Sequence, residues 1–316
     1  MLVLTFLVAL GLAILLAGAE AMVRGSSALA LRLGIAPVIV GLTVVSFGTS
    51  SPELVIGLDA ALTGHGGIAM GNVIGSNICN IALILGVGAL VRPLKVDAKL
   101  IRWDVPIMIG VSFFTMLLIL DGRLGRLEGA ILAAGIVAYN ILQIRQAKQE
   151  KDDNFQTEFG AAVPAGPKPV WVNLVLILAG LALLVFGGHI LIKAATMLAI
   201  SWGVSEEVIA LSMVAFGTSV PELATTLVAS LKGEGDIAVG NAIGSNIFNL
   251  LGILGVTALV MPFEAPDIRT FDLTVMLITA IVAMPLMWSG FVLNRIEGGI
   301  LLFGYAVYIG ILFLDK

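Results

Sequence analysis

The chain contains two copies of one unit, and this duplication constrains its fold more than any other feature. Residues 45–54 (VSFGTSSPEL) recur at 214–223 (VAFGTSVPEL), and residues 71–80 (GNVIGSNICN) recur at 240–249 (GNAIGSNIFN), at a constant offset. Roughly 30 of the 48 positions from 46 to 93 match their counterparts, far more than shared hydrophobicity gives. We therefore divide the chain into a first repeat at 1–146, a linker at 147–170 and a second repeat at 171–316.

Each repeat contains five apolar runs. The chain is 59% hydrophobic and 12% charged, whereas soluble domains carry about a quarter charged residues. Runs of about 20 apolar residues cross the hydrocarbon core of a bilayer as helices. We therefore predict an all-α integral membrane protein with ten transmembrane helices. The expected spans are 2–23, 36–62, 68–91, 104–120 and 126–146, then 172–200, 205–231, 237–261, 271–289 and 295–314.

The odd number of spans in each unit sets the topology. The second copy must enter the membrane from the opposite side, so the repeat is an inverted one, as in many secondary transporters. In this arrangement most of the 17 Lys and Arg residues fall on one side of the membrane. The positive-inside rule makes that side cytoplasmic. We expect a multi-pass protein of the cell membrane with both termini outside and a cytoplasmic linker at 147–170.

The second helix of each repeat is interrupted by proline within the sequence Gly-Thr-Ser-x-Pro-Glu. Proline has no amide hydrogen and displaces the carbonyl four residues before it. Irregular backbone at membrane depth is tolerated where it lines a polar cavity or is buried in protein. We therefore expect broken second and seventh helices at a functional site. Pro52 would free oxygens near Ser46 and Gly48, and Pro221 would free oxygens near Ala215 and Gly217.

A glutamate follows each proline. An ionised group near the bilayer centre costs at least about 2.5–3.5 kcal/mol on insertion scales. Neither Glu53 nor Glu222 has a Lys or Arg within its own span. A bound cation or a proton is therefore expected to compensate each carboxylate. Hydroxyls lie three and four residues before each glutamate and share its helix face, namely Thr49 and Ser50 in the first repeat and Thr218 and Ser219 in the second.

The third helix of each repeat carries a second polar stripe with a spacing of four residues: Asn72, Ser76 and Asn80, repeated as Asn241, Ser245 and Asn249. Carboxylate, amide, hydroxyl and carbonyl oxygens suit hard cations such as calcium and sodium. Taken singly, serine and threonine in membrane helices more often pack than bind ions. Asn77 and Asn246 lie off the stripe, where a structural role bridging helices is the simpler interpretation.

These motifs resemble the repeats of the calcium/cation antiporter superfamily, specifically the small prokaryotic members of its sodium/calcium exchanger branch. The resemblance implies ten helices, alternating access and exchange of calcium for several sodium ions. It places calcium at Glu53 and Glu222 with the main-chain oxygens of Thr49 and Thr218. It places sodium at Ser50, Ser76, Ser219 and Ser245, at the carbonyls of Ser46 and Ala215, and at Asn80 and Asn249. Relatives that depend on potassium carry aspartate at the position of Asn249, so the amide implies potassium independence.

Three other functions were weighed against this one. A proton/calcium exchanger would use the same two glutamates, with protons in place of sodium. An intramembrane hydrolase is not supported, because the chain lacks a His-Glu-x-x-His motif or a Ser/His pair. A channel must release ions easily, which a tight pair of carboxylates would oppose. We therefore expect a transporter rather than an enzyme, without a permanent cofactor or nucleic-acid partner, working as a monomer in the lipid bilayer.

Overall fold

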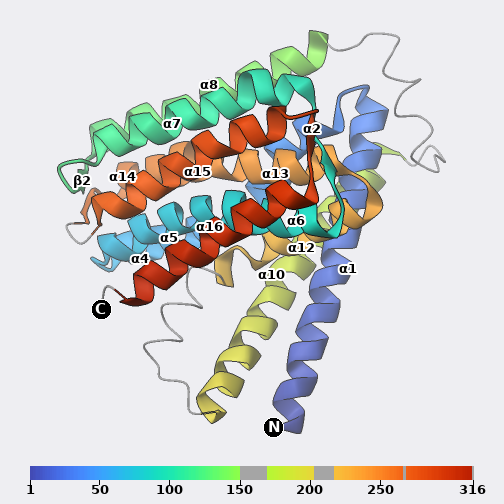
Figure 1. The fold of residues 1–316 in the computed structure, drawn as a ribbon, viewed down its shortest axis with the longest axis horizontal. Helices are drawn as coiled ribbons and strands as arrows, with labels where there is room; N and C mark the ends of the chain where they lie inside the picture. Colours follow the sequence, from blue (N-terminus) through green and yellow to red (C-terminus); the bar gives the residue numbers. More distant parts are fainter. Residues whose placement is uncertain (150–168, 203–216, 266–267, 315–316) are drawn as a thin grey trace.

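A computed structural model describes residues 1–149, 169–202, 217–265 and 268–314 as helices joined by short turns (Figure 1). The first half of the chain begins with one long helix, continues through a bent helix and a helix with a π-helical middle, and ends with a helical hairpin. Its elements are α1 (Leu2–Leu33), α2 (Pro37–Val40), η1 (Gly41–Val45), α3 (Ser46–Thr49), α4 (Ser51–Leu62), α5 (Gly66–Ile78), η2 (Cys79–Leu85), α6 (Gly86–Val91), β1 (Leu94–Lys95), η3 (Leu100–Asp104), α7 (Val105–Leu118), β2 (Arg123–Leu124) and α8 (Arg126–Gln149).

The second half follows the same order. Its elements are α10 (Val170–Ser201), α12 (Val220–Lys232), α13 (Gly235–Ile247), η4 (Phe248–Ile253), α14 (Leu254–Val260), β3 (Phe263–Glu264), α15 (Thr270–Trp288), β4 (Val292–Leu293) and α16 (Arg295–Leu314). Among the described residues, 8 helices are long and apolar enough to span a membrane, or 9 with the bent pair Pro37–Thr49 and Ser51–Leu62 counted as one span. The chain is therefore an all-α, multi-pass membrane protein. The remaining predicted span, the seventh at 205–231, lies partly outside the described residues. A total of ten spans therefore remains a prediction.

The first helix is longer than expected. The predicted end at residue 23 is wrong, because α1 continues to Leu33 and stops at Gly34, whose φ of 67° gives a left-handed cap. The charged side chains along this helix are paired. Glu20 forms ion pairs with Arg24 one turn later and, at 2.7 Å, with Lys232 at the end of α12. These pairs lower the cost of carrying charges inside a long apolar helix.

α1 and α10 lie side by side and project from the remaining helices (Figure 1). Their close approach depends on glycine. A Cβ on Gly18 would lie 2.8 Å from the carbonyl oxygen of Gly180, and a Cβ on Gly180 would lie 2.7 Å from that of Gly18. Small residues allow such backbone contact between membrane helices. The two equivalent helices of the repeats therefore form one closely packed pair.

Two short antiparallel strand pairs join the repeats. β1 pairs with β4, with Leu94 opposite Leu293, and β2 pairs with β3, with Leu124 opposite Phe263. β1 and β3 occupy equivalent positions in the two repeats, as do β2 and β4. Each pair therefore consists of one strand from each repeat, in a reciprocal arrangement. This exchange agrees with repeats that are related by an inversion of topology.

The central spans are the most deeply buried. The helix formed by α5, η2 and α6 and the helix formed by α13, η4 and α14 are mostly enclosed by protein, whereas α1, α8 and α16 face outward over most of their length. Both central helices change from α to π geometry at equivalent positions, at Cys79–Leu85 and Phe248–Ile253. The sequence analysis did not predict these segments. Such π-helical turns are rare and often occur at functional sites.

Candidate cation site

The predicted break in the second helix is present and is repeated in the seventh. α3 ends at Thr49 and α4 begins at Ser51, with a bend of 44° between the two halves. The turn residue Ser50 has φ −87° and ψ 8°, and its counterpart Ser219 before α12 has φ −87° and ψ 5°. Proline occupies the second position of the helix that follows each turn, where its missing amide hydrogen is tolerated. The same local sequence therefore produces the same break twice.

The break does not free both of the carbonyls expected, those near Ser46 and Gly48. The expectation that the Ser46 oxygen is freed is wrong, because the Ser50 amide donates to it at 3.0 Å. Pro52 removes the partner of Gly48 and does not affect the carbonyl two residues earlier. The next bond across the break runs from the Leu54 amide to the Ser50 oxygen, and no described backbone amide donates to the Thr49 oxygen. The Thr49 main-chain oxygen is thus available to a ligand.

Glu53 and Glu222 converge at the centre of the molecule. Each lies in the first turn of the helix that follows a break, and each is 1% exposed. The partially positive amide end of a helix stabilises negative charge there. The two carboxyl groups are close enough to repel each other, and no basic side chain of the described residues is among the groups that act on them. The two buried acidic groups therefore have no counter-ion among the described residues.

The carboxylate oxygens are only partly satisfied by hydrogen bonds. The Ser50 hydroxyl donates to Glu222 Oε1 at 2.8 Å, so the first repeat supports the glutamate of the second. Within the described part of the chain, Glu222 Oε2 and both oxygens of Glu53 have no hydrogen-bond partner. The hydroxyls of Thr218 and Ser219 lie beside Glu53. Three buried carboxylate oxygens without donors are costly unless something positive binds them.

Two equivalent hydrogen bonds connect the repeats beside the carboxylates. Thr49 Oγ1 donates to Asn241 Oδ1 at 3.1 Å, and Thr218 Oγ1 donates to Asn72 Oδ1 at 3.2 Å. Each bond therefore joins the broken helix of one repeat to the central helix of the other. These bonds engage the hydroxyl hydrogens of both threonines in contacts between the repeats. The asparagines were predicted to lie on the polar stripe, but this positioning role was not anticipated.

The remaining predicted residues also gather in the interior. Ser219 Oγ donates to Ser76 Oγ at 3.3 Å, which brings two of the predicted sodium ligands together. Among the described atoms, the oxygens Asn80 Oδ1, Asn249 Oδ1 and Ser245 Oγ have no hydrogen-bond partner. Ala215 lies outside the described residues. The predicted ligands that the structure buries are Ser46, Thr49, Ser50, Glu53, Ser76, Asn80, Thr218, Ser219, Glu222, Ser245 and Asn249.

The bridging role predicted for Asn77 and Asn246 is confirmed for the Asn246 side chain, and Asn77 takes part through its main-chain oxygen. Asn246 Nδ2 donates to the Asn77 carbonyl at 3.1 Å, and Asn246 Oδ1 accepts a bond from Asn80 Nδ2 at 3.0 Å. These contacts connect the two central helices at and just before the start of their π-helical segments. The orientation of Asn80 beside the site therefore depends on a residue of the opposite repeat.

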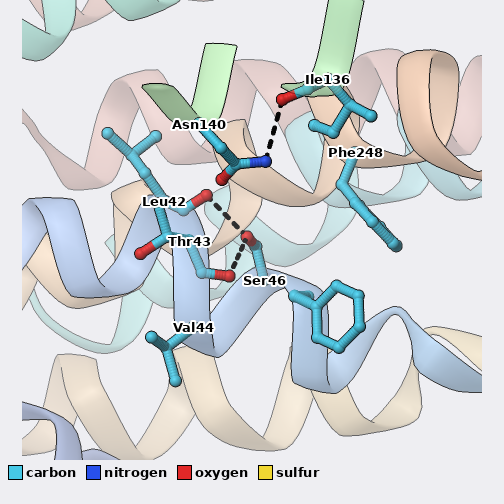
Figure 2. A pocket seen from close by; sticks show the side chains of 8 residues that line it. Leu42, Thr43, Val44, Ser46, Ile136, Asn140 and Phe248 are labelled. Atoms are coloured by element: carbon cyan, nitrogen blue, oxygen red, sulfur yellow. Dashed lines mark hydrogen bonds between the residues drawn. The ribbon is translucent and has the colours of Figure 1, made fainter. Parts of the chain in front are cut away.

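A cavity of about 300 Å³ lies to one side of the site, between α8 and the first half of the broken helix (Figure 2). Its lining is mainly apolar, with Phe47, Phe248 and Ile136 among its residues. Of the predicted ligands only Ser46 lines it, and the Ser46 hydroxyl donates to the Leu42 carbonyl at 2.8 Å. Neither glutamate reaches this space. The cavity is therefore not the carboxylate site.

The donor set defines the chemistry of the site. No group of three or more His, Cys, Asp or Glu side chains placed to hold a metal ion occurs among the residues that the structure describes. The buried centre instead combines two carboxylates with hydroxyl, amide and carbonyl oxygens. Such oxygen sets suit calcium and sodium, whereas zinc and copper prefer imidazole and thiolate ligands.

Comparisons with known proteins agree with this geometry. The family model described as sodium/calcium exchanger protein matches residues 3–145 and 172–314. The chain is 39% identical to the inner membrane protein YrbG of Escherichia coli over 91% of this chain and 90% of that protein. It is 30% identical to the sodium/calcium exchanger MaX1 of Methanosarcina acetivorans over 96% and 97% of the two chains. A structure of the sodium-calcium exchanger NCX_Mj, soaked with Na⁺ and Ca²⁺, superposes with a TM-score of 0.84 at 29% identity, covering 98% of each chain. With its repeated motifs, membrane-spanning helices and matches across nearly its whole length, the chain belongs to the sodium/calcium exchanger family.

Proposed function

We propose that this protein exchanges calcium for sodium across the cell membrane, with both ions using the site around Glu53 and Glu222. The observation that carries the proposal is the group of three buried carboxylate oxygens, contributed by both repeats, that have no hydrogen-bond partner among the described residues. Two negative charges match one calcium ion. The name of MaX1 and the ions in the NCX_Mj structure support the same pair of cargoes.

Calcium is held by four groups in this proposal. Glu53 and Glu222 supply carboxylate oxygens, and Thr49 and Thr218 supply main-chain oxygens. The support for the main-chain ligands is that both threonine hydroxyls are engaged by asparagine, while no described amide donates to the Thr49 oxygen. Oxygen ligands from several helices give calcium the high coordination number that it prefers.

Sodium occupies overlapping positions. Its ligands are Ser50, Ser76, Ser219 and Ser245 with the carbonyls of Ser46 and Ala215, and Asn80 and Asn249 complete the central position. Ser46 still has a lone pair to offer, because a carbonyl oxygen that accepts one hydrogen bond keeps a second acceptor direction. Amides at both Asn80 and Asn249 leave the site with two carboxylates, which supports exchange that does not require potassium.

Coupling follows from the shared carboxylates. Calcium and sodium exclude each other because both need Glu53 and Glu222. An empty site carries uncompensated charge in the membrane interior, at a cost of at least about 2.5–3.5 kcal/mol per ionised group. Only the loaded and neutralised site therefore changes readily between outward-open and inward-open states. This restriction makes the protein an antiporter that works by alternating access.

The moving part in this proposal is the α1–α10 pair. Gly18 and Gly180 hold the two helices backbone to backbone, so they are expected to move against the other helices as one body. Both termini lie outside and the linker at 147–170 is cytoplasmic. One chain contains both halves of the site, which supports a monomer as the working unit.

The test uses purified protein in vesicles. Vesicles loaded with sodium are diluted into sodium-free medium with labelled calcium, and uptake is compared with that at equal sodium and with that under a proton gradient alone. We expect uptake that depends on the sodium gradient, is unaffected by removal of potassium, and is lost in Glu53→Gln and Glu222→Gln. Uptake driven by protons alone would assign the protein to proton/calcium exchange. Calcium flux without any gradient dependence would refute antiport.

A further inference from the structure

A line of unpartnered polar atoms continues beyond the carboxylates. Asn249 on η4 is buried, and neither polar atom of its amide has a hydrogen-bond partner among the described residues. Thr257 lies two turns later on α14, is 1% exposed, and its hydroxyl is likewise unpartnered. A threonine hydroxyl in a helix can bond the carbonyl four residues back, as Thr43 does to Ile39 at 2.7 Å. Thr257 does not, so its hydroxyl is aimed elsewhere.

The Thr257 hydroxyl faces a position without a side chain. A Cβ on Gly57 of α4 would lie 3.7 Å from Thr257 Oγ1 and 3.4 Å from Ile253 Cγ2. Gly57 follows Glu53 by one helical turn. α4 packs along η4 and α14, so Glu53, Gly57, Asn249 and Thr257 border one interface. This interface begins at the carboxylates and runs toward the face of the protein where α4 ends at Leu62 and α14 ends at Val260.

The equivalent interface in the other half is more crowded. There Gly88 of α6 faces α12, and a Cβ on Gly88 would lie 3.0 Å from Ser230 Oγ and 3.1 Å from Thr226 Cγ2. The Ser230 hydroxyl bonds the Thr226 carbonyl at 2.7 Å. The inverted repeat thus provides two routes of similar design to opposite faces. Among the described residues both routes contain an unpartnered threonine hydroxyl, that of Thr257 in one and that of Thr226 in the other, and the route beside Thr257 has the wider spacing.

We infer that the interface between α4 and α14 is a cation path, in which the Thr257 hydroxyl is a transient ligand and Gly57 leaves the space through which the ion passes. The inference rests on the proposed function and extends it to the route by which calcium or sodium reaches the Glu53 end of the site. An unpartnered hydroxyl buried inside a membrane protein is unfavourable, because it has lost its hydrogen bonds to water. A passing cation, with the water that accompanies it, supplies the missing partner. In the proposed orientation this route opens to the outside.

Cysteine accessibility tests the path without relying on exchange. Cys79 is the only cysteine of the chain, so Thr257→Cys in a Cys79→Ser background places one thiol in the interface. A membrane-impermeant, positively charged methanethiosulfonate is applied to each side of oriented vesicles. We expect modification from the side where α4 ends, and slower modification when calcium is present. A thiol that is inert from both sides, in protein that still unfolds cooperatively, would show a dry interface and overturn the inference.

Transport kinetics give the second test. Thr257→Val keeps the shape and removes the oxygen, whereas Thr257→Ser keeps the oxygen. We expect Thr257→Val to raise KM for calcium about tenfold at the face where α4 ends, and at that face alone, which is the effect of losing one hydrogen-bonding contact to a charged group. Thr257→Ser should behave as wild type. Thr115→Val on α7 is the matched control, because it also removes a buried, unpartnered hydroxyl.

The outcomes separate this inference from the proposed function. An unchanged KM in Thr257→Val, or equal changes at both faces, would refute the path even where sodium drives calcium uptake in the wild type. Absence of sodium-driven uptake in the wild type would refute the proposed function, and the thiol modification would still decide whether a cation enters beside Thr257. Gly57→Ala tests whether the space between α4 and α14 is needed for transport. Its Cβ contacts are ordinary van der Waals distances, so the variant should fold and transport more slowly.

Discussion

Replacing Ser50 with alanine should weaken calcium binding more than replacing its repeat equivalent Ser219. The two serines stand in the same motif and adopt the same turn conformation. Their hydrogen bonds differ. Ser50 Oγ donates to the Glu222 carboxylate at 2.8 Å, whereas Ser219 Oγ donates to the Ser76 hydroxyl at 3.3 Å. The first is a short, charge-assisted bond and the second is a longer bond between neutral groups.

The magnitude follows from this difference. A hydrogen bond to a charged group contributes about 1.5–3 kcal/mol, and a bond between neutral groups contributes about 0.5–1.5 kcal/mol. Loss of the Ser50 hydroxyl removes its 2.8 Å bond to the Glu222 carboxylate and makes the ionised form of Glu222 less stable. The difference of about 1–1.5 kcal/mol corresponds to about a five- to tenfold larger increase in Kd for Ser50→Ala than for Ser219→Ala.

The assay is calcium titration of purified protein in detergent, by isothermal calorimetry, for both variants and the wild type. Ser51→Ala is the matched control, because the Ser51 hydroxyl lies in the same turn but donates to the Phe47 carbonyl at 2.8 Å. The Kd of Ser51→Ala should stay within about twofold of the wild-type value, because substitutions away from the buried site rarely change a free energy by more than about 0.5 kcal/mol. Equal effects of Ser50→Ala and Ser219→Ala, or a larger effect of Ser219→Ala, would refute the reasoning.

Three further predictions concern the ion site and the helix pair. Glu53→Gln should abolish the stabilisation that bound calcium gives the wild type, which is about 2.7 kcal/mol at a calcium concentration of one hundred times Kd. Asp104→Asn, which replaces another buried carboxylate, should retain this stabilisation. Melting scans with and without calcium test both variants. Gly180→Ala should lower the free energy of unfolding by about 1–3 kcal/mol, and with it the melting temperature, because its Cβ would meet backbone atoms of α1 at 2.7 Å. Gly188→Ala meets only a leucine methyl at 3.9 Å and should unfold like wild type. Asn249→Asp should tighten calcium binding about tenfold by adding a third carboxylate beside the ion, and calorimetry showing no gain would contradict the central place of this residue.

Much of the fold could be predicted because lipid leaves few choices. Each span must satisfy its own backbone hydrogen bonds, so apolar runs of sufficient length become helices. The break before Glu53 also followed from local chemistry, because proline cannot donate a hydrogen bond wherever it lies in a helix. Helix ends were less certain. α1 continued ten residues beyond its expected end and stopped at Gly34, where glycine adopts the left-handed cap conformation.

The composition of the candidate site was predictable, but its internal asymmetry was not. The duplicated motif marked Glu53 and Glu222 with their neighbouring hydroxyls and amides, and the structure buries these groups together. A repeat implies equal roles for equivalent residues. The structure instead gives Ser50 a carboxylate partner and Ser219 a hydroxyl partner, and it leaves Glu53 with fewer donors than Glu222.

The sequence by itself determined that the chain enters the membrane, that it consists of two related halves, and which oxygen-bearing residues lie near its centre. These properties depend on composition, periodicity and local backbone chemistry, which neighbouring residues fix. Only the tertiary structure decided which hydroxyl supports which carboxylate, that Asn72 and Asn241 hold the threonines of the opposite repeat, and that Thr257 faces Gly57. These contacts join residues from different repeats, so their distances depend on how the helices pack rather than on any local pattern.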